Sequence, residues 1–309
     1  MDLILSHCSS LYISTLILLL FAAKGTSESM FNFTNKCDYT VWPGILANAG
    51  SSPLDTTGFE LPPGGSRNYK VPPNWSGRFW GRTGCTFDPH TGQGGCVTGD
   101  CGSNKVECNG AGANPPATLA EFTVGSGAQD YYDVSLVDGY NLPMVVQAGG
   151  GSGSCLSTGC VTDLNQHCPT ELRVGEGEGC KSACEAFGRP DYCCSGAYGS
   201  PATCKPSVYS EMFKTACPKS YSYAYDDATS TFTCMGADYT IIFCPLSTSR
   251  KSARDTSPTT GSVTGSNNDT VVVDSPWFPD FFTGHSSETL SFSPSSIASV
   301  ALLLFLTMH

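Results

Sequence analysis

Seventeen cysteines constrain this 309-residue chain more than any other feature of its sequence. Cys8 lies in an N-terminal apolar leader, and the other sixteen lie between residues 37 and 244, an even number as full pairing requires. None of them forms the C-x-x-C pair that is typical of zinc sites. Adjacent Cys193 and Cys194 would be strained if bonded to each other, so each pairs elsewhere. The set indicates a disulfide framework made in an oxidising compartment, and we expect no metal site and no cofactor.

Residues 1–27 have the pattern of a secretory signal peptide. An apolar run of 13 residues, 11–23, is followed by small residues, although the segment before it carries little positive charge. Thirteen residues are too few to cross a bilayer as a helix, which takes about 20. We expect cleavage between Ala23 and Ser29.

The C-terminal part of the chain changes composition. Residues 247–288 are rich in Ser and Thr and read as a linker, and residues 289–309 end in an apolar tail. Small residues, a polar spacer and a terminal apolar tail form the pattern of a GPI-attachment signal, with a candidate attachment site near residues 284–287. The alternative is a tail that is retained or trimmed.

Charge excludes further classes of protein. The whole chain has a net charge of −11, and residues 31–246 hold 12 basic and 20 acidic residues, a net of −8. No surplus of Lys and Arg exists to neutralise phosphates, so we expect no nucleic-acid partner. The 40% of hydrophobic residues argue against a disordered acidic chain.

Short strands separated by Gly- and Pro-rich loops dominate the region between the two ends. Alternation and β-branched or aromatic residues predict strands at residues 31–33, 39–41, 79–80, 119–124, 131–136, 142–147, 231–234 and 239–244. Strands at this spacing predict an all-β sandwich or barrel. The 131–136 and 142–147 strands, around Asp138-Gly139, and the last two strands each read as a hairpin. Short helices are predicted at 181–187 and 209–216, where Ser182 or Ser207 could cap.

Other motifs are sparse. Sequons at Asn32, Asn74 and Asn268 predict N-glycosylation. No G-x-S-x-G, H-E-x-x-H or phosphate loop occurs, so carboxylates are the reactive groups that remain.

Several motifs together resemble the plant thaumatin-like (pathogenesis-related) family. The main one is the run from Gly92 to Cys101, followed by Cys108, although Ser103-Asn104 stands where a second glycine is usual. Others are Phe33 to Cys37, Thr40 to Pro43, Phe79 to Cys85, Leu119 to Phe122, Tyr132 to Pro143, Tyr192 to Cys194 and Tyr221 to Cys234. The resemblance covers residues 31–245, with a C-terminal extension beyond it.

The resemblance implies a fold and a disulfide pairing. The thaumatin-like domain, residues 28–246, would hold a β-sandwich core (about 31–82, 121–160 and 218–246), a small disulfide-stapled domain (83–120) and a disulfide-rich loop/helix domain (161–217). Eight disulfides are expected, namely Cys37–Cys244, Cys85–Cys96, Cys101–Cys108, Cys155–Cys234, Cys160–Cys217, Cys168–Cys180, Cys184–Cys193 and Cys194–Cys204.

The resemblance also implies an acidic cleft lined by one Arg, one Glu and three Asp. By motif position these are Arg82, Glu121, Asp133, Asp138 and Asp226, with Arg78 and Asp227 as alternatives to Arg82 and Asp226. Without the resemblance, Asp138 is a turn residue and Asp226 a loop cap. If the cleft is catalytic, Glu121 would be the general acid and Asp138 or Asp133 its partner.

Three hypotheses of function follow from that resemblance. The first is a monomeric, secreted or cell-wall defence protein that binds β-1,3-glucan-type polysaccharide and is antifungal; a GPI anchor would place it at the outer plasma membrane. The second is an endo-β-1,3-glucanase that uses paired carboxylates. The third is a non-catalytic cell-wall or receptor-associated interaction module.

Overall fold

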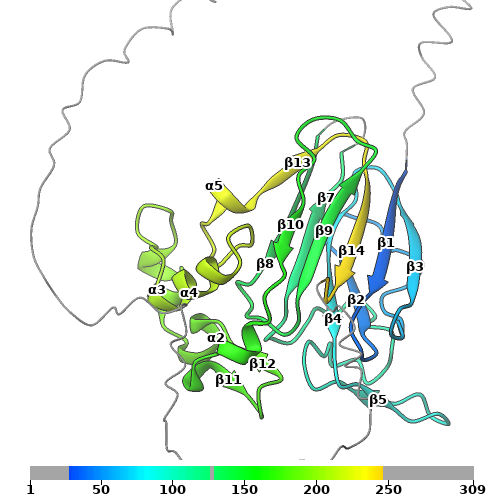
Figure 1. Ribbon diagram of the computed structural model, residues 1–309, viewed down its shortest axis with the longest axis horizontal. Coiled ribbons are helices and arrows are strands. Elements are labelled where there is room, and N and C mark those ends of the chain that lie inside the picture. Colours follow the sequence, from blue (N-terminus) through cyan, green and yellow to red (C-terminus); the bar gives the residue numbers. More distant parts are fainter. Residues whose placement is uncertain (1–27, 126–128, 246–309) are drawn as a thin grey trace, which may run out of the picture. The chain divides into compact units, whose positions relative to one another are not determined.

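Two five-stranded sheets form the centre of the computed structural model, which describes residues 28–125 and 129–245 (Figure 1). The first sheet has the order β10 (Thr158–Cys160), β9 (Met144–Gly149), β14 (Asp238–Phe243), β1 (Ser29–Asn35) and β3 (Ser66–Val71). The second has the order β13 (Phe232–Cys234), β8 (Asp130–Ser135), β7 (Leu119–Thr123), β4 (Ser76–Arg82) and β2 (Trp42–Ala47). The all-β sandwich expected from the sequence is therefore confirmed.

Alternation along the strands builds the core between the sheets. In β1, every second residue is buried and its neighbours are half-buried, as period-2 geometry requires. Phe31 and Phe33 thereby meet Phe79 of the facing sheet, with ring centroids 5.4 and 5.1 Å apart. Aromatic rings continue this contact through the sandwich, at Trp75, Phe122, Tyr132 and Tyr239.

Both predicted hairpins are wrong. Strand β8 lies in the second sheet and β9 in the first, so the segment around Asp138 carries the chain from one sheet to the other. Strands β13 and β14 are divided between the sheets in the same way. Strand β14 instead pairs antiparallel with β9 and parallel with β1. Neither β9 nor β1 is next to β14 in the sequence.

Eight disulfides hold the chain in the pairing that the resemblance implies. Cys37–Cys244 joins the ends of the parallel strands β1 and β14, across 207 residues of sequence. Cys193 and Cys194 bond to Cys184 and Cys204, respectively, as their adjacency required. Long-range and local bridges together fix loops that contain few regular elements.

A loop-and-helix region follows β10. Its elements are η1 (Leu164–His167), η2 (Thr170–Leu172), β11 (Arg173–Val174), β12 (Gly179–Cys180), α2 (Ala183–Phe187), α3 (Pro190–Cys193), η3 (Gly196–Tyr198), α4 (Val208–Ala216) and α5 (Asp227–Ser230). Both predicted helices are present, because Ser182 and Ser207 accept hydrogen bonds from the backbone N–H three residues later. No helix of the described chain is long and apolar enough to cross a membrane.

A smaller stapled region extends from β4. Strands β5 (Thr86–Phe87) and β6 (Gly94–Gly95) pair there, next to the Cys85–Cys96 bridge. A third buried cluster, of Trp80, Cys101, Cys108, Ala117 and Leu119, joins this region to the outer face of the second sheet. The far end of β4 is consequently covered, whereas its beginning is not.

Candidate functional site: a row of charged residues across three strands

One row of charged side chains crosses three neighbouring strands of the second sheet. Arg78 of β4 lies directly opposite Glu121 of β7, which lies directly opposite Asp133 of β8. Directly opposed residues point to the same side of an antiparallel pair, and the residues next to them in sequence point to the other. Those neighbours are buried in the sandwich core: Phe79, Ala120, Phe122, Tyr132 and Val134. The row therefore lies on the outer face of the sheet.

The row keeps hydrogen-bonding capacity that the described residues do not use. Arg78 Nε lies 3.6 Å from Glu121 Oε1, an ion pair too long to be a hydrogen bond. Arg78 Nε and Asp133 Oδ2 are both buried without a hydrogen-bond partner in the described part of the chain. A buried donor and a buried acceptor thus lie in one row. Because buried polar groups in proteins are normally hydrogen-bonded, a ligand that both donates and accepts would suit this row.

Burial and neighbouring charges set the protonation of the two carboxyls. Burial, then the charge of Glu121 and that of Asp227, raises the pKa of Asp133 from 3.8 to about 8, although Arg78 opposes the shift. Burial and the charge of Asp138 likewise raise the pKa of Glu121, again against Arg78. A pKa of about 8 favours the protonated form of the Asp133 carboxyl at neutral pH.

Asp138 follows β8 in a turn that requires glycine. Gly139 has a φ of +84°, and a Cβ placed on it would lie 2.7 Å from the carbonyl oxygen of Cys180 and 2.8 Å from Pro116 Cβ. The turn holds Asp138 partly buried, and burial raises the pKa of its carboxyl against the opposing charge of Arg78. Asp138 is thus electrostatically coupled to the row although strand alternation does not place it there.

A cavity of about 340 Å³ adjoins Asp138. Tyr192, Tyr209 and Tyr223 line it, together with Glu185 of α2. Glu185 Oε2 is buried without a hydrogen-bond partner in the described residues, and burial and the charge of Asp138 raise the pKa of this carboxyl, although Lys181, 3.7 Å away, opposes the shift. Sequence reasoning missed Glu185, because a Glu three residues after Ser182 is the usual residue of a capping box.

The adjacent residues Asp226 and Asp227 have different surroundings. Asp226 Oδ2 accepts a hydrogen bond from the Ser222 backbone N–H at 3.0 Å and lies 2.9 Å from Lys214 Nζ. Asp227 accepts a hydrogen bond from the Tyr221 hydroxyl at 2.8 Å, and its charge acts on Asp133. The alternative, Asp227, is therefore coupled to the row, whereas the carboxylate of Asp226 is held by a lysine.

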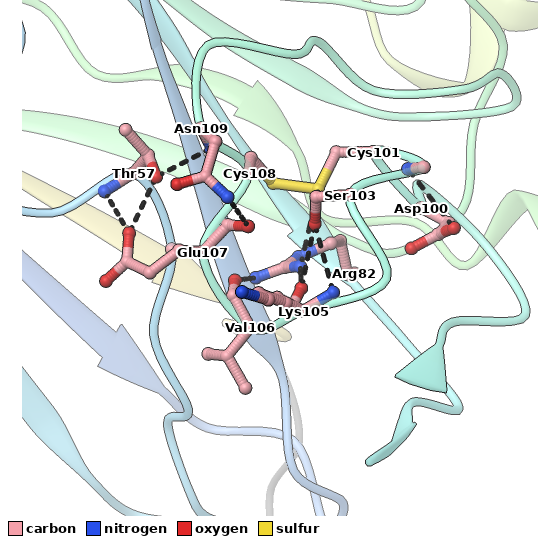
Figure 2. The surroundings of a disulfide bond; sticks show 12 residues. Thr57, Arg82, Asp100, Cys101, Ser103, Lys105, Val106, Glu107, Cys108 and Asn109 are labelled. Atoms are coloured by element: carbon pink, nitrogen blue, oxygen red, sulfur yellow. Dashed lines mark hydrogen bonds between the residues drawn. A yellow bond between two sulfur atoms is a disulfide. The ribbon is translucent and has the colours of Figure 1, made fainter. Parts of the chain in front are cut away.

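Arg82 does not join the carboxylates, which corrects the assignment by motif. Its side chain is fully buried, and its guanidinium donates to the carbonyl of Trp42 at 2.9 Å. The guanidinium also donates to the carbonyl of Val106 at 2.5 Å (Figure 2). It also contacts the carbonyl of Lys105 at 3.4 Å, within the loop that Cys101–Cys108 closes. Burial lowers the pKa of Arg82 to about 10. Arg82 is a structural residue, and Arg78 is the arginine of the row.

The three sequons have unequal surroundings. Asn74 is exposed in the loop before β4, with a φ of +63°. Asn32 lies inside β1, between β14 and β3, and its Oδ1 is buried. Asn268 lies outside the described residues. Asn74 is the better acceptor of the two that the structure describes, and glycosylation stays a prediction.

Comparison with known proteins agrees with this architecture. The model of the Thaumatin family matches residues 35–245. Thaumatin-like protein 1 of Arabidopsis thaliana is 67% identical over 78% of this chain and 96% of its own length. Pathogenesis-related thaumatin-like protein 3.5 of Cryptomeria japonica is 56% identical over 77% of this chain and its whole length. Among solved structures, the thaumatin-like xylanase inhibitor TLXI matches with 25% identity and a TM-score of 0.40, over 70% of this chain and 99% of that chain. The chain belongs to the thaumatin family.

Proposed function

We propose that the outer face of the second sheet binds a neutral polysaccharide of the β-1,3-glucan type. The observation that carries this proposal is the row of Arg78, Glu121 and Asp133, with a buried donor and a buried acceptor that have no hydrogen-bond partner in the described residues. Vicinal hydroxyls both donate and accept hydrogen bonds, so they satisfy a guanidinium and a carboxyl at once. Tyr192, Tyr209 and Tyr223, in the adjoining cavity, add ring faces on which pyranose rings can stack.

A matched pair of substitutions tests binding. Isothermal titration with soluble β-1,3-glucan should show saturable binding by the wild-type chain. Glu121→Gln should weaken it at least tenfold, whereas Glu211→Gln, the same change at an exposed position of α4, should leave it unchanged. Equal affinity of the wild type and the Glu121→Gln variant, or no binding by either, would reject the proposal.

A second candidate is glycosidic hydrolysis at the same carboxylates. A pKa of about 8 favours Asp133 as the protonated group that would donate to the leaving oxygen, although the pKa of Glu121 is raised as well. Glu121 or Asp138 would then activate water or attack the anomeric carbon. New reducing ends that disappear in Asp133→Asn, with binding retained, would support an enzyme. Binding without new reducing ends leaves the binding role alone.

The proposed place of action is outside the cell. We infer secretion, and membrane attachment through a GPI anchor, from the sequence patterns at the two ends, which lie outside the described residues. The defence role is inferred from the similarity to pathogenesis-related thaumatin-like proteins. Phosphatidylinositol-specific phospholipase C should release the membrane-bound protein. A membrane-bound sample that resists release would reject the anchor and leave the glucan proposal untouched.

A further inference from the structure

A second row of side chains lies next to the charged row on the outer face of the second sheet. Ser76 of β4 lies directly opposite Thr123 of β7, which lies directly opposite Tyr131 of β8. Thr233 of β13 lies opposite Tyr131 on its other side. In β4, β7 and β8 these residues are two positions from a member of the charged row, so alternation directs both rows to one face, about 7 Å apart. We call the second row the hydroxyl row, since each of its side chains carries a hydroxyl.

Tyr131 is the large side chain of the hydroxyl row, and it is 49% exposed. The residues directly opposite it, Thr123 and Thr233, are both threonines, which are too short to cover a tyrosine ring. With the described residues, the Tyr131 side chain makes no hydrogen bond and no contact with another ring. An aromatic ring is therefore open to solvent beside the charged row.

The hydroxyl row carries no charge. At one end, Ser76 Oγ lies 3.1 Å from Ser51 Oγ, and at the other end Ser154 Oγ donates to the Thr233 carbonyl at 3.1 Å. Hydroxyl side chains both donate and accept hydrogen bonds. A charged group of a ligand would meet no opposite charge in this row. A neutral pyranose ring would place its apolar face on Tyr131 and its hydroxyls against the neighbouring side chains.

Aromatic groups therefore lie on both sides of the charged row. Along the chain, Tyr131 precedes Asp133 by two residues and Asp138 follows it by five. Asp138 lines the cavity that also holds three tyrosines. A ligand that uses the charged row and both aromatic sides continues past the row in two directions. Such a ligand is a stretch of polymer with sugars on either side of the charged row.

We propose that Tyr131 stacks on a sugar ring of the bound polysaccharide, and that the site takes an internal segment of a long neutral chain. The inference rests on the proposed function, because the ligand is the glucan that the charged row would bind. Tyr131 then determines which chain length binds well. A short oligosaccharide occupies only part of the face, whereas a long chain contacts the charged row, Tyr131 and the cavity together.

Isothermal titration with a β-1,3-glucan trisaccharide and with long soluble β-1,3-glucan tests this role. Tyr131→Thr removes the ring and keeps a β-branched side chain that suits a strand. Tyr131→Phe keeps the ring and removes the hydroxyl. Tyr198→Thr is the matched control, because Tyr198 is a similarly exposed tyrosine, 41%, at the end of η3. Urea unfolding of each variant checks that it folds.

The wild type should bind the long glucan more tightly than the trisaccharide. Tyr131→Thr should weaken binding of the long glucan by about tenfold, since a lost ring contact of about 1.4 kcal/mol corresponds to that factor. Tyr131→Phe and Tyr198→Thr should bind like the wild type. As a readout that needs no folded Thr variant, the NMR signals of the Tyr131 ring, assigned by their absence in Tyr131→Phe, should shift when long glucan is added.

Glu121→Gln, titrated beside these variants, separates this inference from the proposed function. If Glu121→Gln weakens binding of the long glucan and Tyr131→Thr does not, the role of Tyr131 is overturned and the proposed function stands. Equal weakening by Tyr131→Thr and Tyr131→Phe overturns it as well, because the hydroxyl and not the ring would then make the contact. Ring signals of Tyr131 that do not shift, or equal affinity of the wild type for the two ligands, also overturn the inference. No binding of glucan by the wild type rejects the proposed function and this inference together.

Discussion

Glu121 and Asp133 face each other as direct partners across β7 and β8, on the outer face of the second sheet. Carboxylates in this position repel one another, and like charges directly opposite destabilise a sheet. Arg78, opposite Glu121 on the next strand, offsets part of the repulsion. The remainder is relieved by a proton on Asp133, whose pKa lies at about 8. The sheet therefore favours a proton on Asp133, while the pKa of Glu121 is raised as well.

The first prediction concerns the pH dependence of stability. The pKa of Asp133 is about 8 in the folded chain and 3.8 without the fold, so its contribution to stability is complete below pH 3.8 and is lost as the pH rises to about 8. Asp133→Asn removes this loss. Urea unfolding should show the variant more stable than the wild type by several kcal/mol at pH 8, on the order of 1.4 kcal/mol for each pH unit between 3.8 and about 8, and nearly equal to it at pH 4.

Asp226→Asn is the matched control, since Asp226 pairs with Lys214. It should destabilise the chain at pH 8 rather than stabilise it. A stability difference between Asp133→Asn and wild type that does not change between pH 4 and pH 8 would contradict a raised pKa.

The second prediction separates the two arginines of β4. Arg78→Gln removes a buried donor of the row and should weaken glucan binding at least tenfold, with a loss of less than about 1 kcal/mol in the free energy of unfolding. Arg82→Gln leaves carbonyls of Trp42 and Val106 without their donor and should cost about 3 kcal/mol or more. Its effect on glucan binding should be small. Titration and urea unfolding of both variants measure the contrast, and equal loss of stability in the two would refute the division of roles.

Strand β4 also shows where sequence reasoning stops. Arg78, Trp80 and Arg82 alternate onto one face of the strand, so periodicity cannot distinguish the two arginines. The difference arises because the stapled region covers the far end of β4 and leaves its beginning open. That covering depends on contacts between β4 and residues 101–108, which no local pattern contains.

The other sequence predictions succeeded where the structure depends on nearby residues and failed where it depends on long-range contacts. The helices capped by Ser182 and Ser207 depend on residues three apart and could be predicted. The hairpins were wrong because alternation shows which residues form a strand and not which strand lies beside it. The disulfide pairing came from the resemblance alone. Asp227 was predicted only as an alternative to Asp226 for the charged row. The sequence does not show that Asp226 is the one of the two that pairs with Lys214.

The third prediction concerns the turn that holds Asp138. Gly139→Ala places a Cβ against the carbonyl of Cys180 and against Pro116, at a φ of +84°. Urea unfolding should show a loss of about 2–4 kcal/mol, because strain and a clash add. Gly150→Ala is the matched control, with a φ of +74° and open space around the new Cβ, and should cost only about 1 kcal/mol. Equal losses of stability in the Gly139→Ala and Gly150→Ala variants would contradict the prediction, because they would show that the clash with Cys180 and Pro116 costs nothing.

The fourth prediction concerns the lysine that holds Asp226. Lys214 Nζ of α4 donates to the Ser220 carbonyl at 3.1 Å and to Ser230 Oγ at 2.7 Å, besides its contact with Asp226. Both charged side chains are mostly buried, 25% and 12% exposed, so removing one leaves the other uncompensated.

Lys214→Met should therefore cost about 2–3 kcal/mol at pH 7, measured by urea unfolding. The double variant with Asp226→Asn should cost less than the sum of the two single changes, by about 1 kcal/mol or more, since it leaves no unpaired charge. Strict additivity of the two would show that the pair is not coupled. Amide hydrogen exchange should report the loosening first in α5 and β13, because Lys214 of α4 donates to Ser230 at the end of α5, two residues before β13 begins.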